Sequence, residues 1–385
     1  MNNNYGSFTS ISTYFSQPMD IDYYWKFIII IGSYYILPSL QFVFFQSKDS
    51  NVVCYYNNKC KKDLYFIPAF NNIISNILYI FLGLLFLIIV KINTKSQIDN
   101  IEFNVINNAP ALYYSLGLSL FFEGVCSAIY HICPSMLNFQ FDTTFMFLGC
   151  ILVFITIYQK RHIAPSPMKI YSYSAIVIFV NTLPLSGLSS GFEIWFWGGI
   201  TLFLSYFMVF GSIYLYYDQE YDFEIESFRV LCKKMYNLKK RDIPKLLLIS
   251  SINIFTIGMY VYATITQPNF TDWLLGVFII NLVIYFLYYI LQKIRNKEKI
   301  AKIIWVWIFL DIVILTLAII FYSIAVSDKL LTPTESNKLN KECVLLAYFD
   351  YHDIWHILSS IGLFIFMNII FFIDNNNLNE DVNIF

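Results

Sequence analysis

The chain has 385 residues, of which 58% are hydrophobic, 19% aromatic and only 13% charged. A mean hydropathy of +0.59 and long runs without charge exclude a disordered chain, a coiled coil and a small disulfide-rich fold. The formal net charge of -1 provides no overall basic field, so any binding of nucleic acid would have to be local. The composition is that of a protein embedded in a lipid bilayer.

Apolar segments recur along the whole chain. A membrane-spanning helix needs about 20 predominantly apolar residues, because the hydrocarbon core is about 30 Å thick and each helical residue rises about 1.5 Å. We therefore predict an all-α fold, a polytopic membrane helix bundle of about ten transmembrane helices. The predicted segments are 27–46, 64–90, 109–132, 141–158, 170–188, 194–217, 246–266, 273–291, 303–326 and 353–373.

The orientation follows from Lys and Arg, which are enriched in cytosolic loops. The loops after the second, fourth, sixth and eighth segments contain 17 of them, whereas the loops on the other side contain seven: Lys48, Lys59, Lys61, Lys62, Lys329, Lys338 and Lys341. Both termini are therefore predicted to be cytosolic. We expect a short cytosolic segment (1–23) without a secretory signal, a transmembrane domain (24–374) and a cytosolic tail (375–385). The acidic, Asn-rich stretch from Asp374 onwards is expected to be solvated.

The cysteines provide an independent test of this topology. Four of the seven fall on the side predicted to be extracytosolic, where disulfides persist. These are Cys54, Cys60, Cys133 and Cys343, which allow three pairings. Since Cys133 and Cys343 lie close in sequence to His131 and His352, we favour bridges from the Cys54/Cys60 loop to those two positions over a direct bond between Cys54 and Cys60.

Three of the four histidines fall at membrane ends. His131 ends a segment predicted to run outward, and His352 and His356 begin one predicted to run inward, so all three imidazoles are expected at the same depth near the outer interface. A His-x-x-x-His pair alone is more typical of interfacial or core histidines than of a metal site. The third histidine at matching depth favours a metal site.

Two further polar residues are predicted at this depth. Ser127 precedes His131 by one helical turn, and Asp142 begins the next segment too soon for the chain to have crossed the bilayer. Three neutral imidazoles with a fourth position left to water is a common arrangement of catalytic zinc. We therefore predict zinc bound by His131, His352 and His356, with Asp142 as the general base or the residue that orients the water, and Ser127 as a hydrogen-bonding partner or oxyanion donor.

Other polar residues inside the predicted segments have less certain roles. Asn71, Asn72, Ser75 and Asn76 form a polar patch in the second segment, for which interhelical hydrogen bonding and lining of the zinc cavity are both open interpretations. Glu123 lies one turn deeper than Ser127, and Asp311 has no evident partner. Ionisable residues inside a membrane are functional candidates by default.

Several motifs resemble one known family. They are CYYNNKC at 54–60, AFNNIISNILYIFLGLLFLI at 69–88, EGVCSAIYHICPSMLNFQFDTTFMF at 123–147, YQKRH at 158–162 and DYHDIWHILSS at 350–360. In order and spacing they resemble the SID (systemic RNA interference defective) transmembrane family, within the CREST superfamily of intramembrane zinc hydrolase-like proteins. The resemblance implies a zinc site built from the Ser127 and His131 element, Asp142 and the late His352 and His356 pair.

The same resemblance implies double-stranded RNA transport at the plasma or endolysosomal membrane, association with membrane lipids and cholesterol, and homodimer formation. Members usually carry an extracytosolic β-rich domain ahead of the matched region, which these residues lack, so we expect them to bind RNA weakly on their own. Two functions stay open. One is zinc-dependent hydrolysis of a lipid amide or ester, and the alternative is RNA uptake or sterol and lipid handling with a purely structural zinc.

Overall fold

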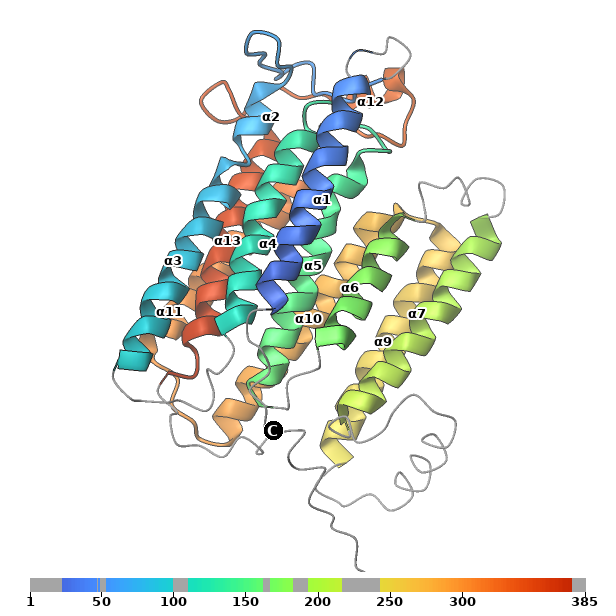
Figure 1. Cartoon of the computed structure of the whole chain (residues 1–385). Coiled ribbons are helices and arrows are strands. Elements are labelled where there is room, and N and C mark those ends of the chain that lie inside the picture. The colour runs from blue at the N-terminus through green and yellow to red at the C-terminus, as the bar shows by residue number, and fades with distance from the viewer. Residues whose placement is uncertain are drawn as a thin grey trace, which may run out of the picture.

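The computed structural model describes residues 23–46, 48, 53–99, 110–161, 167–182, 193–216 and 243–375. Over these ranges the chain is predominantly α-helical (Figure 1), and eight spans are long and apolar enough to cross a membrane. The predicted all-α membrane bundle is therefore confirmed. The long helices are α1 (Tyr23–Gln46), α3 (Ile77–Asp99), α4 (Pro110–Tyr130), α5 (Phe139–Gln159), α6 (Pro167–Thr182), α7 (Glu193–Tyr216), α9 (Ile243–Thr266), α10 (Phe270–Arg295), α11 (Lys302–Tyr322) and α13 (Tyr351–Phe372).

Each of the ten predicted segments overlaps one of these helices, but the second was predicted wrongly at its start. Residues 64–67 form a tight turn in which the backbones of Leu64 and Ile67 pair. Helix begins only at α2 (Phe70–Ile74) and breaks at Ser75 and Asn76 before α3 resumes the span. A short capped helix that we did not predict, α12 (Pro333–Leu339), lies in the connection before α13.

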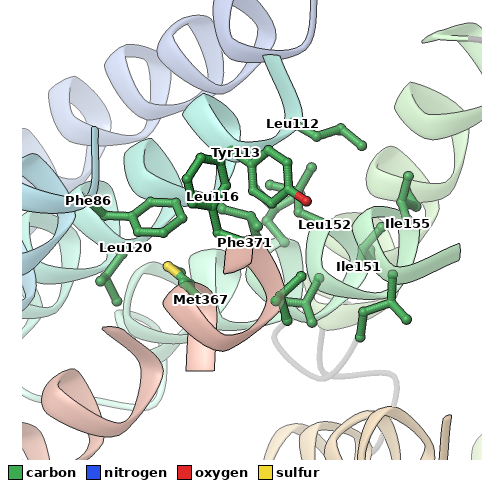
Figure 2. Packing of buried hydrophobic residues seen from close by; sticks show 14 of the residues in the cluster. Phe86, Leu112, Tyr113, Leu116, Leu120, Ile151, Leu152, Ile155, Met367 and Phe371 are labelled. Atoms are coloured by element: carbon green, nitrogen blue, oxygen red, sulfur yellow. The ribbon is translucent and has the colours of Figure 1, made fainter. Parts of the chain in front are cut away.

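Helices α4 and α5 form the centre of the bundle. Their spans are 72% and 78% buried, compared with 17% for α9 and α11. Helix α4 packs against α1, α3 and α5, while α13 packs against α3 and α11. Figure 2 shows side chains of α3, α4, α5 and α13 meeting in the main apolar cluster, among them Phe86, Leu116, Leu152 and Phe371. The polar groups that emerge at the ends of these helices are thereby held on rigid elements.

The contact between α3 and α4 depends on glycine. A Cβ atom added at Gly83 would lie 2.7 Å from the backbone nitrogen of Phe121 and 2.8 Å from the carbonyl oxygen of Gly117. The two backbones therefore touch, as is common where small residues face each other in membrane helices.

Two disulfides close one end of the bundle, which we call the disulfide end. Cys54 is bonded to Cys133, and Cys60 is bonded to Cys343. The favoured pattern of bridges is confirmed, and all four cysteines lie at the same end. Helices α2 and α12 are also at this end, whereas the described chain ends at the other, which we call the opposite end (Figure 1).

Candidate metal centre

A short connection between α4 and α5 brings the first half of the site together. Helix α4 ends at Tyr130, and His131 still donates its backbone N–H to the carbonyl of Ser127 at 3.1 Å. The connection is fixed by the disulfide at Cys133, whose carbonyl accepts a hydrogen bond from the Asn138 side chain at 2.8 Å. Asp142 consequently lies in the first turn of α5, at the same end as His131.

The start of α13 positions the second half. Asp350 is the N-cap, and its carboxylate accepts hydrogen bonds from the backbone N–H groups of His352 and Asp353 at 2.9 and 3.0 Å. The Asp353 carboxylate accepts in return from the Asp350 N–H at 3.0 Å, which completes a capping box. Because the helix starts at Tyr351, His352 and His356 fall one turn apart on the same face.

The three predicted histidines meet at the disulfide end. The ring centroids of His131 and His352 are 5.2 Å apart, those of His131 and His356 are 4.9 Å apart, and those of His352 and His356 are 4.5 Å apart. One nitrogen from each ring lies within 4.8 Å of the other two. Zinc–nitrogen bonds of about 2.0–2.1 Å would draw these atoms somewhat closer together. The cluster can therefore hold a metal ion.

Unsatisfied polar atoms around the cluster fit this assignment. Within the described residues, Nε2 of His131 and of His356, Oγ of Ser127 and Oδ1 of Asp142 are buried and form no hydrogen bond. Buried polar groups are normally paired, so four such atoms together require a missing partner. Unprotonated imidazole nitrogens suit zinc, and a water on the ion would satisfy the oxygens.

A cavity of about 670 Å³ extends from the cluster. His131, Asp142 and His352 line its polar part together with Asp272 and Lys329. Apolar residues that line it include Met146 of α5, Leu275, Gly276, Ile279 and Ile280 of α10, and Ile319 of α11.

The cavity is open between α10 and α11. Its lining residues Ile279, Ile280 and Ile319 are 43%, 37% and 62% exposed, so they also form part of the outer surface of the bundle. Both helices are membrane spans. The cavity is therefore lined in part by two helices that are long and apolar enough to cross a membrane.

The polar part of the cavity also carries a lysine that was not predicted from sequence. Burial lowers the pKa of Lys329 to about 8, although the nearby carboxyl groups of Asp272 and Asp142 act in the other direction. The Tyr322 hydroxyl donates to Asp272 at 2.8 Å. The cavity thus presents acidic, basic and imidazole groups at one end and hydrocarbon at the other.

The residues behind the histidines were not predicted from sequence either. The Ser75 hydroxyl lies 2.9 Å from Nδ1 of His356, and Asn71 donates to the Asp353 carboxylate at 2.9 Å. Trp355 packs on both histidines of α13, with centroids 5.0 Å from His352 and 4.8 Å from His356. Of these residues, the sequence singled out only Asn71 and Ser75, as members of the polar patch in the second predicted segment.

At the opposite end, the expectation of a solvated stretch from Asp374 onwards was wrong for Asp374 itself. Its side chain is buried and lies 3.0 Å from Lys160, 2.6 Å from Lys293 and 3.2 Å from Arg161. Glu298 pairs with Arg161 and Lys293, each at 2.6 Å. The error arose because charged residues at the ends of spans were taken to be solvated, whereas here they pair with one another.

Of the remaining candidates, Glu123 and Asp311 are buried in the bundle. Both oxygens of Glu123, and Oδ1 of Asp311, form no hydrogen bond to any residue that the structure describes. Neither residue belongs to the histidine cluster.

The fold and the site together define a polytopic α-helical membrane protein with a three-histidine cluster beside a cavity lined by residues of α5, α10 and α11. Residues 13–384 match the family described as dsRNA-gated channel SID-1, and the chain belongs to this family. It is 33% identical over 381 residues to SID1 transmembrane family member 1 of Homo sapiens, covering 92% of this chain and 45% of the human protein. It is 28% identical over 390 residues to cholesterol uptake protein 1 of Caenorhabditis elegans, covering 95% of this chain and 51% of that protein.

The chain thus spans about half the length of the curated relatives that it matches. The match includes the segments that carry the histidine cluster and both disulfides. The expected membership of the SID transmembrane family is confirmed.

Proposed function

We propose that this chain handles membrane lipids, binding a sterol or another amphiphile that enters its cavity from the bilayer. The observation that supports this most directly is the continuity of the cavity from the histidine cluster to the gap between α10 and α11. An amphiphile would place its polar group near His131, Asp142 and Lys329 and its apolar part against Met146 and Ile279. The volume lies within the range of roughly 300–1,000 Å³ that is usual for small-molecule sites.

A sterol is the ligand that we put first. It has one small polar group on a large apolar body, which matches a cavity lined both by the polar residues around the histidines and by apolar residues of α10 and α11. The relative named cholesterol uptake protein 1 supports this choice. We place the chain in the plasma membrane or an endolysosomal membrane, with both termini cytosolic and the disulfide end facing away from the cytosol.

The proposed metal is zinc, with His131, His352 and His356 as ligands. When bound, zinc would supply an acidified water and polarise a carbonyl oxygen. If the chain only handles lipids, the role of zinc is structural, because it joins the end of α4 to the start of α13.

Hydrolysis of a lipid amide or ester is a second candidate, favoured by the position of Asp142. This carboxylate lines the cavity beside His131, and its Oδ1 is unpaired within the described residues, so it could accept a proton from a water molecule. Ser127 lies beside it and would orient the same water. A short-chain fluorescent ceramide tests this candidate: hydrolysis by the wild type that falls steeply in Asp142→Asn, with zinc retained, would support it.

Double-stranded RNA transport is the third candidate, and the family description favours it. The loops predicted to be extracytosolic carry only seven Lys and Arg residues. Because phosphate contacts supply most of the affinity for nucleic acids, we propose that these residues bind RNA weakly on their own. Tight, salt-sensitive binding of RNA by the purified chain would move transport to first place.

The cavity offers a matched pair of variants for the lipid proposal. Gly276 lines the cavity, and a Cβ atom added there would meet no atom within 4 Å, so Gly276→Leu should fill the space without disturbing the helices. Gly258 of α9 has equally open surroundings but does not line the cavity. Labelling by a photoactivatable cholesterol probe should fall several-fold in Gly276→Leu and stay at the wild-type level in Gly258→Leu. Equal labelling of both variants would contradict binding in this cavity.

A further inference from the structure

The break in the second span lies beside the histidine cluster. Ser75 and Asn76 separate α2 from α3, and both side chains are almost completely buried. We propose that this break is a positioning element for the metal site, in which Ser75 holds the His356 ring so that Nε2, and not Nδ1, is presented to the ion. This inference rests on the proposed zinc site and assigns a role to the polar patch, for which sequence alone left two interpretations open.

The break changes which groups the Asn72 carbonyl accepts. In a continuous helix this carbonyl would accept the backbone N–H of Asn76, four residues later. Here the Asn76 N–H donates to Ile73 instead, at 3.3 Å. The Asn72 carbonyl then accepts the Ser75 hydroxyl at 2.8 Å and the Asn76 side-chain amide at 2.9 Å.

This arrangement determines the role of Ser75 toward His356. A serine hydroxyl has one hydrogen, and Ser75 donates it to a carbonyl that can only accept. With the hydroxyl hydrogen directed to that carbonyl or to the Asp353 carboxylate, which Ser75 also contacts, the 2.9 Å contact between Ser75 Oγ and His356 Nδ1 uses a lone pair of the hydroxyl, and this favours the hydrogen on Nδ1. In a neutral imidazole this leaves Nε2 unprotonated, as a metal ligand requires.

The opposite tautomer would cost a hydrogen bond. If Nε2 carried the hydrogen, Nδ1 could only accept, and Ser75 would have to give up its hydrogen bond to the Asn72 carbonyl in order to donate to it. Nε2 itself is buried and unpaired among the described residues, which suits a metal ligand. The His356 ring is also confined between Trp355 and Tyr79, with centroid distances of 4.8 and 6.3 Å, so it cannot readily turn over.

A second contact from the same segment supports the positioning role. Asn71, one turn before Ser75, donates to the Asp353 carboxylate, whose other interactions form the capping box of α13. The Asn71 side-chain oxygen accepts the Lys62 backbone N–H at 3.0 Å, so its orientation is fixed. Helix α2 thus holds both the start of α13 and the ring of its second histidine.

The test compares three serine variants in the full chain. Ser75→Ala removes the acceptor, Ser75→Thr keeps a hydroxyl, and Ser115→Ala removes a buried hydroxyl of α4 that bonds only to the carbonyl of Ala111. Zinc affinity is measured by competition with a chromophoric chelator. We expect Ser75→Ala to weaken zinc binding by about 10–100-fold, as for other groups behind metal ligands. Ser75→Thr and Ser115→Ala should stay within a few-fold of the wild type.

A second readout separates positioning from general destabilisation. The chain has only four histidines, so ¹⁵N spectra of the metal-free, histidine-labelled protein can resolve the tautomer of His356. We expect a protonated Nδ1 in the wild type and in Ser75→Thr, and loss of that preference in Ser75→Ala. A wild type that binds no zinc would overturn the proposed metal site itself. Wild-type zinc affinity in Ser75→Ala, or an unchanged tautomer, would overturn the positioning role and leave the metal site intact.

Discussion

Cys60 and Cys343 are disulfide-bonded across 283 residues of sequence, with Cα atoms 4.9 Å apart. The bond joins the loop before α2 to the segment before α13. Asn57, three residues before Cys60, donates to the Asp350 carboxylate that caps α13 at 2.9 Å. The disulfide therefore helps to place the start of the helix that carries two of the three histidines.

We predict that Cys126 and Cys150 are reactive thiols in non-reduced, denatured protein and that Cys54, Cys60, Cys133 and Cys343 are not, because these four form disulfides. Mass spectrometry after alkylation would count them. Cys343→Ser should destabilise the fold by about 2–5 kcal/mol, as is typical for loss of a native disulfide. Cys150→Ser is the control, since Cys150 forms no disulfide. Seven reactive thiols would contradict the framework.

We predict one zinc ion per wild-type chain and much less in His131→Ala, His352→Ala and His356→Ala, because two imidazoles bind zinc far less tightly than three. Asp142→Asn should retain zinc, since Asp142 is expected to contact the water and not the ion. Elemental analysis of protein purified without chelator measures both results. A chelator should lower the melting temperature of the wild type but not of His356→Ala, because only the wild type loses a stabilising ligand. A metal-free wild type would refute this prediction.

We predict that Asp374→Asn destabilises the protein by about 3–5 kcal/mol at neutral pH, because it leaves buried cations without their partner. Burial alone would raise the pKa of Asp374, but the attraction of Lys160, Lys293 and Arg161 is stronger and lowers it below its usual value. Asp63→Asn is the control, since the ion pair of Asp63 with Lys61 is partly exposed and should contribute less than about 1 kcal/mol, and the asparagine oxygen can still accept the Ala69 N–H.

The lowered pKa fixes the pH dependence of this difference. A carboxylate stabilised in the fold contributes fully above its unfolded-state pKa of about 3.9 and loses its contribution as the pH falls toward the lower folded-state value. The stability difference between wild type and Asp374→Asn should therefore be constant from pH 7 to pH 5 and shrink only below about pH 4. Chemical unfolding at several pH values measures it. A difference that shrank already between pH 7 and pH 5 would contradict the buried ion cluster.

We predict that Gly83→Ala destabilises the bundle by about 1–3 kcal/mol, because the new methyl group would press against the backbone of α4. Gly198→Ala, where no atom lies within 4 Å of the added carbon, should be neutral or slightly stabilising, since alanine favours helix over glycine. Thermal unfolding in detergent compares the two. Equal effects would show that α3 and α4 are not in backbone contact.

Sequence was sufficient to predict the features that follow from the length of apolar segments or from the number of residues of one type on each side of the membrane. Runs of apolar residues located the spans, and the direction of each span was sufficient to place His131, His352 and His356 at one depth. The distribution of cysteines indicated both disulfides. Each of these inferences needs only helix geometry and the side of the membrane on which a residue lies.

What sequence could not provide depends on side chains from different helices. Hydropathy does not distinguish a continuous span from one broken at Ser75, because the break changes hydrogen bonds and not polarity. Asp272 and Lys329 could not be assigned to the cavity, since nothing local indicates which loops lie beside the histidines. Asp374 was misjudged because its three cationic partners are far away in the sequence.

Helix α13 is tied down at both ends. At the disulfide end Asp350 and Asp353 accept hydrogen bonds from Asn57 and Asn71, and Asp374 lies in the ion cluster just beyond the other end. A shift of α13 along its own axis would break the ion pairs of Asp374 at one end. At the other end it would break the hydrogen bonds of the capped segment that the disulfide holds. Helix α13 therefore cannot slide along its axis. If the protein changes shape during its cycle, α4, α5 and α13 form the stationary part. The moving part is then to be sought among α6, α7 and α9, which lie to the right of α5 in Figure 1 and of which α7 packs against α9.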